Sequence, residues 1–274
     1  MPSIFENAED TNRRMKRAGL SRIAPAVLKL LQPSIRLVIG EHSEEPITRL
    51  GGTPNLPADI AWPTRRSGDP HSFLAQIDLA ALGICDGLPL PYEGSLFFFC
   101  DAEYLPDSSD PRDVSDGIKV LYSTTSLSNN RIRTPPPGLK SEFIFESFSL
   151  KPALDLTAPA QDVWEIECLH LNDTESYAYG ELFTQVCGSD ESVHRMGGHP
   201  NVVQYGRRAS GGGSEAANWR LLLQLDSEND AGMTWGDQGR LYFMIRDHHL
   251  RSLSFDKVGL DCQGADLRYR ALLH

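Results

Sequence analysis

The stretch TRLGGTPNL (residues 48–56) decides the fold, because it returns as HRMGGHPNV (residues 194–202) later in the chain. Each copy places an arginine just before a Gly-Gly pair and a Pro-Asn pair just after it. Glycine adopts backbone angles that are closed to other residues, proline fixes its own φ, and asparagine can bond the nearby backbone. The arginine side chain is a fork of five donors that could tie such a turn down. The pattern predicts one ordered turn, used twice.

Two further blocks recur in the same order. The strand-like segment FLAQID (residues 73–78) returns as LLLQLD (residues 221–226), and GSLFFF (residues 94–99) returns as GRLYFM (residues 239–244). Both blocks are rich in the apolar, β-branched and aromatic residues that favour strands. A glutamine inside the apolar second block needs hydrogen-bond partners, since an unsatisfied buried amide is costly. We expect this glutamine to bond the Gly-Gly turn, so that both blocks form one structural device.

The three blocks keep nearly the same spacing. Measured at Gly51, Gln76 and Gly94, the second copies follow after 146, 148 and 145 residues. A repeat of this length is domain-sized and is not a solenoid element. The sequence therefore predicts an internal duplication. The residues expected to build each half are the repeated ones: Gly51, Gly52, Pro54, Gln76, Gly197, Gly198, Pro200 and Gln224.

The remaining patterns predict an α+β fold with a strand-rich core made of two similar, duplicated halves. Residues 10–31 have the spacing of an amphipathic helix, which Pro25 kinks or splits and Pro33 ends. Strands are expected at residues 35–39, 72–78, 94–101, 118–123 and 142–150, with loops at residues 101–117 and 123–138 and a helix at residues 173–188. The predicted organisation is an N-terminal helix packed on the body (1–34), a first repeat (35–150), and a linking segment with the second repeat (151–274), the two repeats forming one compact unit.

Composition narrows the class of protein. The formal net charge of −11 argues against a nucleic-acid binder and against adsorption to an anionic membrane, and it suits a basic partner. The five cysteines are odd in number and form no CxxC pair, which favours reduced thiols over a disulfide framework. The first residues lack the apolar region of a secretory signal, and no apolar run is long enough to cross a bilayer. We therefore expect a cytoplasmic protein.

Several carboxylates are candidates for chemistry. In WGDQG (residues 235–239), Asp237 could ligate a metal or bind an amine; alternatively it caps a turn while Trp235 packs in the core. Other aspartates end apolar strands, where they could hold Mg²⁺ or Ca²⁺, form an acid/base pair, or simply cap strand-end turns: Asp78, Asp101, Asp226 and Asp247. Turn capping is the preferred interpretation of all of them.

Other signals for catalysis and cofactors are weak. His194 and His199 are five residues apart and His248 and His249 are adjacent, and neither spacing is a zinc signature. The glycine-rich run at residues 209–214 lacks the lysine of a phosphate loop and reads as flexible. We therefore predict no catalytic residue, no metal and no cofactor.

A family resemblance rests on four long motifs. GGTPNLPADIAWP, FLAQIDL, LPLPYEGSLFFFCD and LLLQLDS with MTWGDQGRLYFMIRDHHL resemble the YwqG-like family, a bacterial domain of unknown function, over residues 35–262. The resemblance implies a strand-rich α+β fold and no established reaction. It also implies, by analogy with members found among toxin and immunity systems, a role as an immunity protein.

Three functions remain open at this point. The first is a soluble, non-enzymatic binding protein that engages a protein partner, with an immunity-type inhibitor of a basic toxin domain as the example. The second is an enzyme or a small-molecule or metal-binding protein that uses the cleft between the repeats; the third is a scaffold role through the N-terminal helix. The residues expected to bind a partner or ligand are Trp235, Asp237, Asp247, Asp78, Arg49 and Arg195. Function is expected where the halves differ: at residues 235–238, at residues 101–117 and in the loop before Gly138.

Overall fold

The computed structural model describes residues 7–42, 47–83, 85, 88–106, 110–125, 131–187, 193–203 and 218–264. The helices are α1 (Ala8–Arg17), α2 (Ala24–Val27), α3 (Leu79–Leu82), α4 (Pro111–Gly117), α5 (Trp164–Glu167), α6 (Asp173–Cys187) and α7 (Asp247–Arg251), with 3-10 turns η2 (Ser141–Phe143) and η4 (Phe255–Lys257). The strands are β1 (Gln32–His42), β2 (Arg49–Leu50), β3 (Asn55–Leu56), β4 (Ser72–Asp78), β5 (Ser95–Cys100), β6 (Ile118–Ser123), β7 (Arg131–Ile132), β8 (Phe148–Thr157), β9 (His194–Gly197), β10 (Trp219–Asp226), β11 (Arg240–Arg246) and β12 (Gly259–Gln263).

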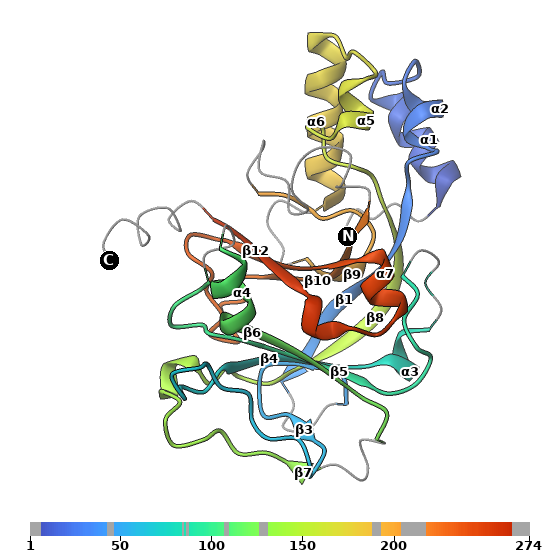
Figure 1. The fold of residues 1–274 in the computed structure, drawn as a ribbon. Helices are drawn as coiled ribbons and strands as arrows, with labels where there is room; N and C mark the ends of the chain where they lie inside the picture. The colour runs from blue at the N-terminus through green and yellow to red at the C-terminus, as the bar shows by residue number, and fades with distance from the viewer. Residues whose placement is uncertain are drawn as a thin grey trace.

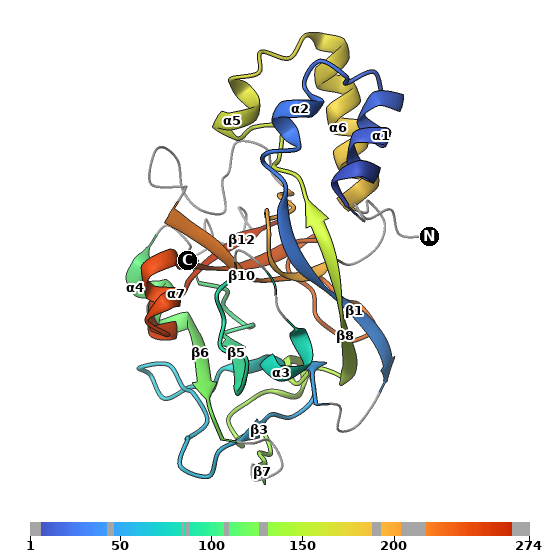
Figure 2. The same cartoon turned by 90° about the vertical axis from the view of Figure 1, so that its right-hand side faces the viewer.

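One sheet of ten strands organises the chain. Its order is β12-β11-β10-β9-β1-β8-β2-β4-β5-β6, and all its pairings are antiparallel. The long pair β1 and β8 crosses the middle of the molecule (Figures 1 and 2). Strands β9, β10, β11 and β12 lie on the β1 side of this pair, and strands β2, β4, β5 and β6 lie on the β8 side. β3 belongs to a separate two-stranded sheet with β7. β1 from the first half therefore borders the second half's strands, and β8 borders those of the first half.

The central pair corrects two sequence-based predictions. Residues 142–150 were expected to form a strand and residues 151–162 a connection, but β8 begins at Phe148 and continues to Thr157. The predicted boundary between the repeats, at residues 150 and 151, falls inside this strand. Pro152 does not break the strand: β2 pairs with β8 only at Phe148 and Ser149, so Pro152 lies where β8 has a single neighbour. Proline is tolerated at such positions.

Two other elements differ from expectation for local reasons. Residues 101–117 were expected to be a loop, yet α4 forms at Pro111, where proline fits the first helical turn and Asp110 accepts a hydrogen bond from the Arg112 N–H at 2.8 Å. The segment at residues 10–31 is divided into α1 and α2, as a split at Pro25 predicted, but the break lies earlier, at residues 18–23. Pro25 lies in the first turn of α2, where its missing N–H costs no helical bond.

Side chains from strands near opposite ends of the sheet pack together in the hydrophobic core. β5 is buried at all six positions, as its apolar sequence predicts. The ring of Phe98 on β5 meets that of Phe243 on β11 edge to face, with centroids 5.2 Å apart. The sheet thus curls so that strands distant in the sheet share one hydrophobic cluster. The fold is strand-rich, with helices at its margins.

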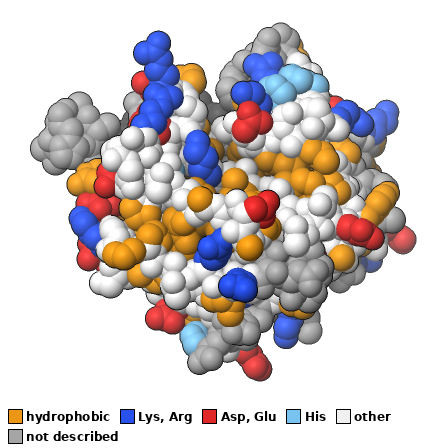
Figure 3. Space-filling view, turned by 60° about the horizontal axis from the view of Figure 1, so that its bottom comes forward, with side chains coloured by type: hydrophobic (Ala, Val, Ile, Leu, Met, Phe, Trp, Pro, Cys, Tyr) orange, Lys and Arg blue, Asp and Glu red, His pale blue; other side chains and the backbone are white. Residues whose placement is uncertain are grey.

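A separate helical layer covers one end of the sheet (Figure 1). α1, α2, α5 and α6 pack around their own apolar cluster, which includes Met15, Leu20, Ile166 and Tyr179. Among the described residues, no helix has both the length and the apolar character needed to cross a membrane. The opposite end of the molecule has a mixed surface, in which hydrophobic side chains lie among basic and acidic ones (Figure 3).

Candidate functional site

The first Gly-Gly turn is held by a buried glutamine. Gln76 on β4 donates from Nε2 to the carbonyl oxygen of Ile47 at 2.8 Å, and its Oε1 accepts from the Asn55 N–H at 2.8 Å. Arg49 is buried beside it and donates from Nη2 to Gln76 Oε1 at 3.1 Å and to the Asn55 side chain. The amide of Gln76 thus satisfies the backbone at both ends of the turn.

The second turn repeats these bonds with its own residues. Gln224 on β10 donates from Nε2 to the carbonyl oxygen of Val193 at 2.8 Å, and its Oε1 accepts from the Asn201 N–H at 2.9 Å. Arg195 is buried as well, but its Nη2 lies 3.7 Å from a carboxylate oxygen of Asp155 on β8. Burial raises the pKa of Asp155 against the opposing effect of Arg195. The glutamine bonds are therefore common to both turns, while the arginine contacts differ.

The second glycine of each pair packs against the central strands. Gly52 and Gly198 have φ angles of +71° and +70°, which favour glycine. A Cβ at Gly52 would lie 2.7 Å from Ser147 Cβ, and one at Gly198 would lie 2.7 Å from Ser34 Cβ. The first-half turn thus touches the chain entering β8, and the second-half turn touches both β1 and the end of β8, at Ser34 and Thr157. Pro54 and Pro200 precede the two asparagines whose N–H groups the glutamines bind.

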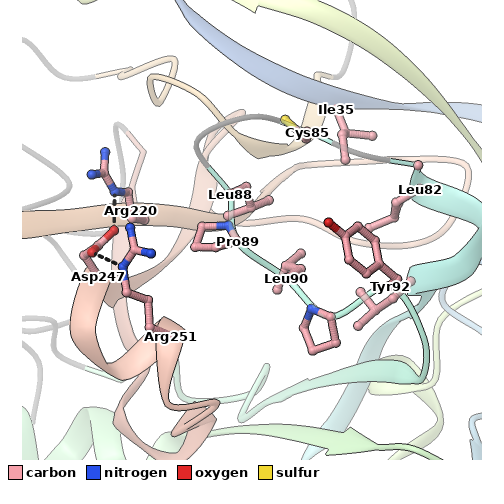
Figure 4. Close-up of a pocket in the computed structure, with 13 residues that line it drawn as sticks. Ile35, Leu82, Cys85, Leu88, Pro89, Leu90, Tyr92, Arg220, Asp247 and Arg251 are labelled. Atoms are coloured by element: carbon pink, nitrogen blue, oxygen red, sulfur yellow. Dashed lines mark hydrogen bonds and ion pairs between the residues drawn. The ribbon is translucent and has the colours of Figure 1, made fainter.

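A pocket of about 250 Å³ lies between residues of both halves (Figure 4). Its apolar wall comes from α3 and residues 88–92 of the first half, together with Ile35 of β1. Its polar rim comes from the second half: Arg220 on β10, and Asp247 and Arg251 on α7. Tyr92 lies across the pocket from this rim, with Leu88 and Leu90 between them.

The three charged rim residues are linked by hydrogen bonds. Asp247 accepts from Arg220 Nε at 3.1 Å through one oxygen and from Arg251 Nε at 2.7 Å through the other. The hydrogen bond from Arg251, assisted by that from Arg220, lowers the pKa of Asp247 despite partial desolvation. Asp247 therefore stays ionised at neutral pH. Counting the described lining residues, the rim carries two guanidinium groups and one carboxylate, which leaves one positive charge.

The wall is continuous with the hydrophobic core. Leu79, Leu82 and Leu88 are buried members of the main cluster, whereas the Tyr92 side chain is 72% exposed at the mouth. Asp78 caps α3, accepting from the Ala80 N–H at 3.4 Å, and so helps to position this wall. The site combines an apolar interior with a few charged groups at its edge, as small-molecule sites commonly do.

The other expected binding residues lie elsewhere. Trp235 is buried: its Nε1 donates to the Asp226 carbonyl oxygen at 3.1 Å and its ring meets that of Phe145 edge to face. Asp237 is exposed on the turn before β11. Asp247 is thus the only one of the six expected residues that lines the pocket, since Asp78, Arg49 and Arg195 are also absent from its lining. Trp235 packs in the core, as the alternative interpretation of WGDQG expected.

The remaining strand-end aspartates also have structural partners. Asp101 contacts Arg65, whose guanidinium also lies 3.4 Å from Asp113 and 3.5 Å from Asp116. Asp226 pairs with Arg240 at 2.7 Å. Within the described residues no three His, Cys, Asp or Glu side chains are placed to hold a metal ion. The glycine-rich run at residues 209–214 lies outside the described residues.

The sequence reasoning missed most of the pocket. Leu88, Leu90 and Tyr92 belong to the motif LPLPYEG, which reads as a proline-rich connection. Arg220 precedes a repeated block and so appeared incidental. One signal was available: Asp247 and Arg251 are four residues apart, a spacing at which helical side chains pair.

Comparison with known proteins gives a family and no function. No curated protein matches the chain. A family model described as a domain of unknown function, DUF1963, matches residues 48–263. The matched span contains both Gly-Gly turns and every pocket residue except Ile35. The chain therefore belongs to the DUF1963 family of domains of unknown function.

Proposed function

We propose that the chain is a non-catalytic binding protein and that the pocket between its halves receives the bound group. The observation that carries the proposal is the meeting of an apolar wall from one half with a charged rim from the other. A non-catalytic role is supported by Asp247, because both its oxygens accept from arginines and its pKa is lowered. A general base works best with a pKa near the operating pH.

The test blocks the pocket. Leu90→Trp places a large ring among the wall residues, and hexan-1-ol and hexanoate serve as probes with the same short apolar chain. Saturation-transfer NMR on the full chain is expected to detect at least one probe with the native protein and neither with Leu90→Trp. Probe signals of equal strength in both proteins would show that the pocket is not the binding site.

A second candidate is a basic protein partner, such as a toxin domain that this chain would inhibit as an immunity protein. It is favoured by α5 and α6, because residues 160–187 contain six carboxylates and no lysine or arginine, although Arg22 of the neighbouring basic segment at residues 7–31 pairs with one of these carboxylates, Glu175. Trp164 and Tyr177 in this segment are 66% and 72% exposed. Exposed aromatic residues are enriched at protein interfaces. The mixed surface at the opposite end of the molecule offers no comparable excess of one charge (Figure 3).

This candidate has its own test. The double variant Glu165→Lys and Glu167→Lys changes the charge of α5 without touching the pocket. A single basic protein that co-purifies stoichiometrically with the native chain, and not with this variant, would support the proposal. A partner retained by the variant and lost from Leu90→Trp would place protein binding at the pocket instead.

The architecture supports a further proposal about origin: the two halves arose by duplication, with their first strands exchanged. The matching glutamine bonds support the duplication, and the pairing of β1 with β9 supports the exchange. Membership of the YwqG-like group and a cytoplasmic location also remain proposals. Cys85, Cys100 and Cys262 are buried and form no disulfide among the described residues, which is compatible with that location.

A further inference from the structure

We propose that the pocket takes a small monocarboxylate with a compact apolar body, whose carboxylate is held by Arg220 and Arg251. The inference rests on the proposed function and specifies its ligand. The first argument is charge: among the described residues, the rim has one guanidinium more than it has carboxylates, in a chain whose net charge is −11. Because the chain is acidic overall, its composition does not explain a local excess of positive charge at the rim. One bound carboxylate would neutralise it.

The geometry of the arginines points to the same ligand. Both bind Asp247 through Nε, and in the described part of the chain neither donates from its Nη groups to another residue. Their side chains are 33% and 64% exposed, so these groups are accessible. Paired N–H groups of arginine match the two oxygens of a carboxylate. Asp247 acts as the internal counter-ion that fixes both forks at the rim.

Size and polarity limit the rest of the ligand. The pocket volume of about 250 Å³ lies below the ~300–1,000 Å³ of typical drug-sized sites, so the body is compact. The leucines of the wall offer apolar contact, and Tyr92 stands opposite the rim. A free amino acid fits less well, because its ammonium group would lie beside two guanidinium groups. Inorganic phosphate would leave the apolar wall uncovered.

The experiment compares three probes that share one chain: hexanoate, hexanamide and hexylamine. Calorimetric titration of the full chain at low salt is expected to give hexanoate an affinity about tenfold above that of hexanamide, since charge-assisted hydrogen bonds are stronger than neutral ones. Hexylamine should bind more weakly still. Arg251→Gln should cost hexanoate about tenfold and leave hexanamide unchanged.

Controls separate this inference from the proposed function. Arg112→Gln makes the same charge change on exposed α4, away from the pocket, and should leave all three affinities unchanged. Equal affinities for hexanoate and hexanamide, both lost in Leu90→Trp, would overturn the carboxylate assignment and keep the pocket. Hexanoate binding that Leu90→Trp leaves intact, or no binding of any probe at millimolar concentration, would overturn both.

One measurement does not depend on the variants folding. Hexanoate should shift the backbone amide signals of α3, residues 88–92 and α7 in the native protein. Shifts confined to other regions would place the carboxylate outside the pocket and contradict the inference.

Discussion

Leu90 and Trp235 occupy matching positions in the two halves, but the two side chains differ in burial and packing. The third repeated block aligns Gly94 with Gly239, which places Leu90 opposite Trp235. Leu90 lines an open pocket, whereas Trp235 is buried and packs against Phe145. The backbone differs as well, since φ is positive at Gly94 before β5 but at Gly236 and Gln238 before β11. Alignment of the repeated block therefore does not fix how the residue four positions before it packs. We infer that the Trp235 ring fills a space in the second half, whereas the smaller Leu90 side chain leaves the pocket open in the first half.

The largest effect is expected when this difference is removed. Trp235→Leu would lose ring packing and the hydrogen bond to the Asp226 carbonyl oxygen, lowering the free energy of unfolding by about 4 kcal/mol. Leu90→Ala, at the half-buried counterpart, should cost about 1 kcal/mol because the side chain already borders a cavity. Urea titrations monitored by circular dichroism measure both. Similar losses at the two positions would break the comparison.

The two Gly-Gly turns should respond alike to a methyl group. Gly52→Ala and Gly198→Ala each place a Cβ 2.7 Å from a serine Cβ at positive φ, so each should cost about 3 kcal/mol. Gly68→Ala is the matched control: its φ is also positive, but no atom lies within 4 Å of the added Cβ. The control should cost about 1 kcal/mol from the backbone alone. Thermal unfolding of the three variants gives the ranking, and a control as costly as the other two would argue against the packing explanation.

The glutamines test whether the turns are energetically equivalent. Gln76→Ala and Gln224→Ala each leave one carbonyl and one N–H of the turn without their bonds, which should cost about 2 kcal/mol. Chemical denaturation should return the same loss for both. A much larger loss at Gln224 would indicate that its contact with Asp226, absent from the first half's set of bonds, carries part of the stability.

The smallest effect concerns pH. The pKa of Asp247 is lowered in the folded chain, so its contribution to stability is present above the unfolded value of 3.8 and is lost as pH falls through the folded value. Because the pair is partly exposed, Asp247→Asn should cost less than about 1 kcal/mol at pH 7. The stabilities of the native chain and the variant should converge below pH 3.8. A gap that persists at lower pH would mean that the side chain contributes through packing and not through its charge.

Local patterns predicted the parts of the fold that local rules govern. The bounds of β4 and β6 match the expected strands, because each is a short, mainly apolar segment whose ends are marked by polar residues or glycine. β8 was misplaced because Pro152 is tolerated only through its place in the sheet, which sequence spacing does not reveal. The pairing of β1 with β8 and β9 joins residues that are distant in the chain. The pocket was missed for the same reason, since its wall and rim come from segments more than a hundred residues apart.

The position of β1 has a consequence for synthesis of the chain. β1 pairs with β8 and β9, and the Gln32 carbonyl oxygen accepts a hydrogen bond from the hydroxyl of Thr157, 125 residues later in the chain. β1 therefore lacks these partners until the later residues have been synthesised. The first half emerges from the ribosome with β2 lacking the neighbour that β8 provides, and high contact order of this kind slows folding. Neither half can complete its sheet alone. We expect nascent chains that stop before β8 to remain open to proteases and to bind chaperones, and to become protected only when residues 148–157 have left the exit tunnel.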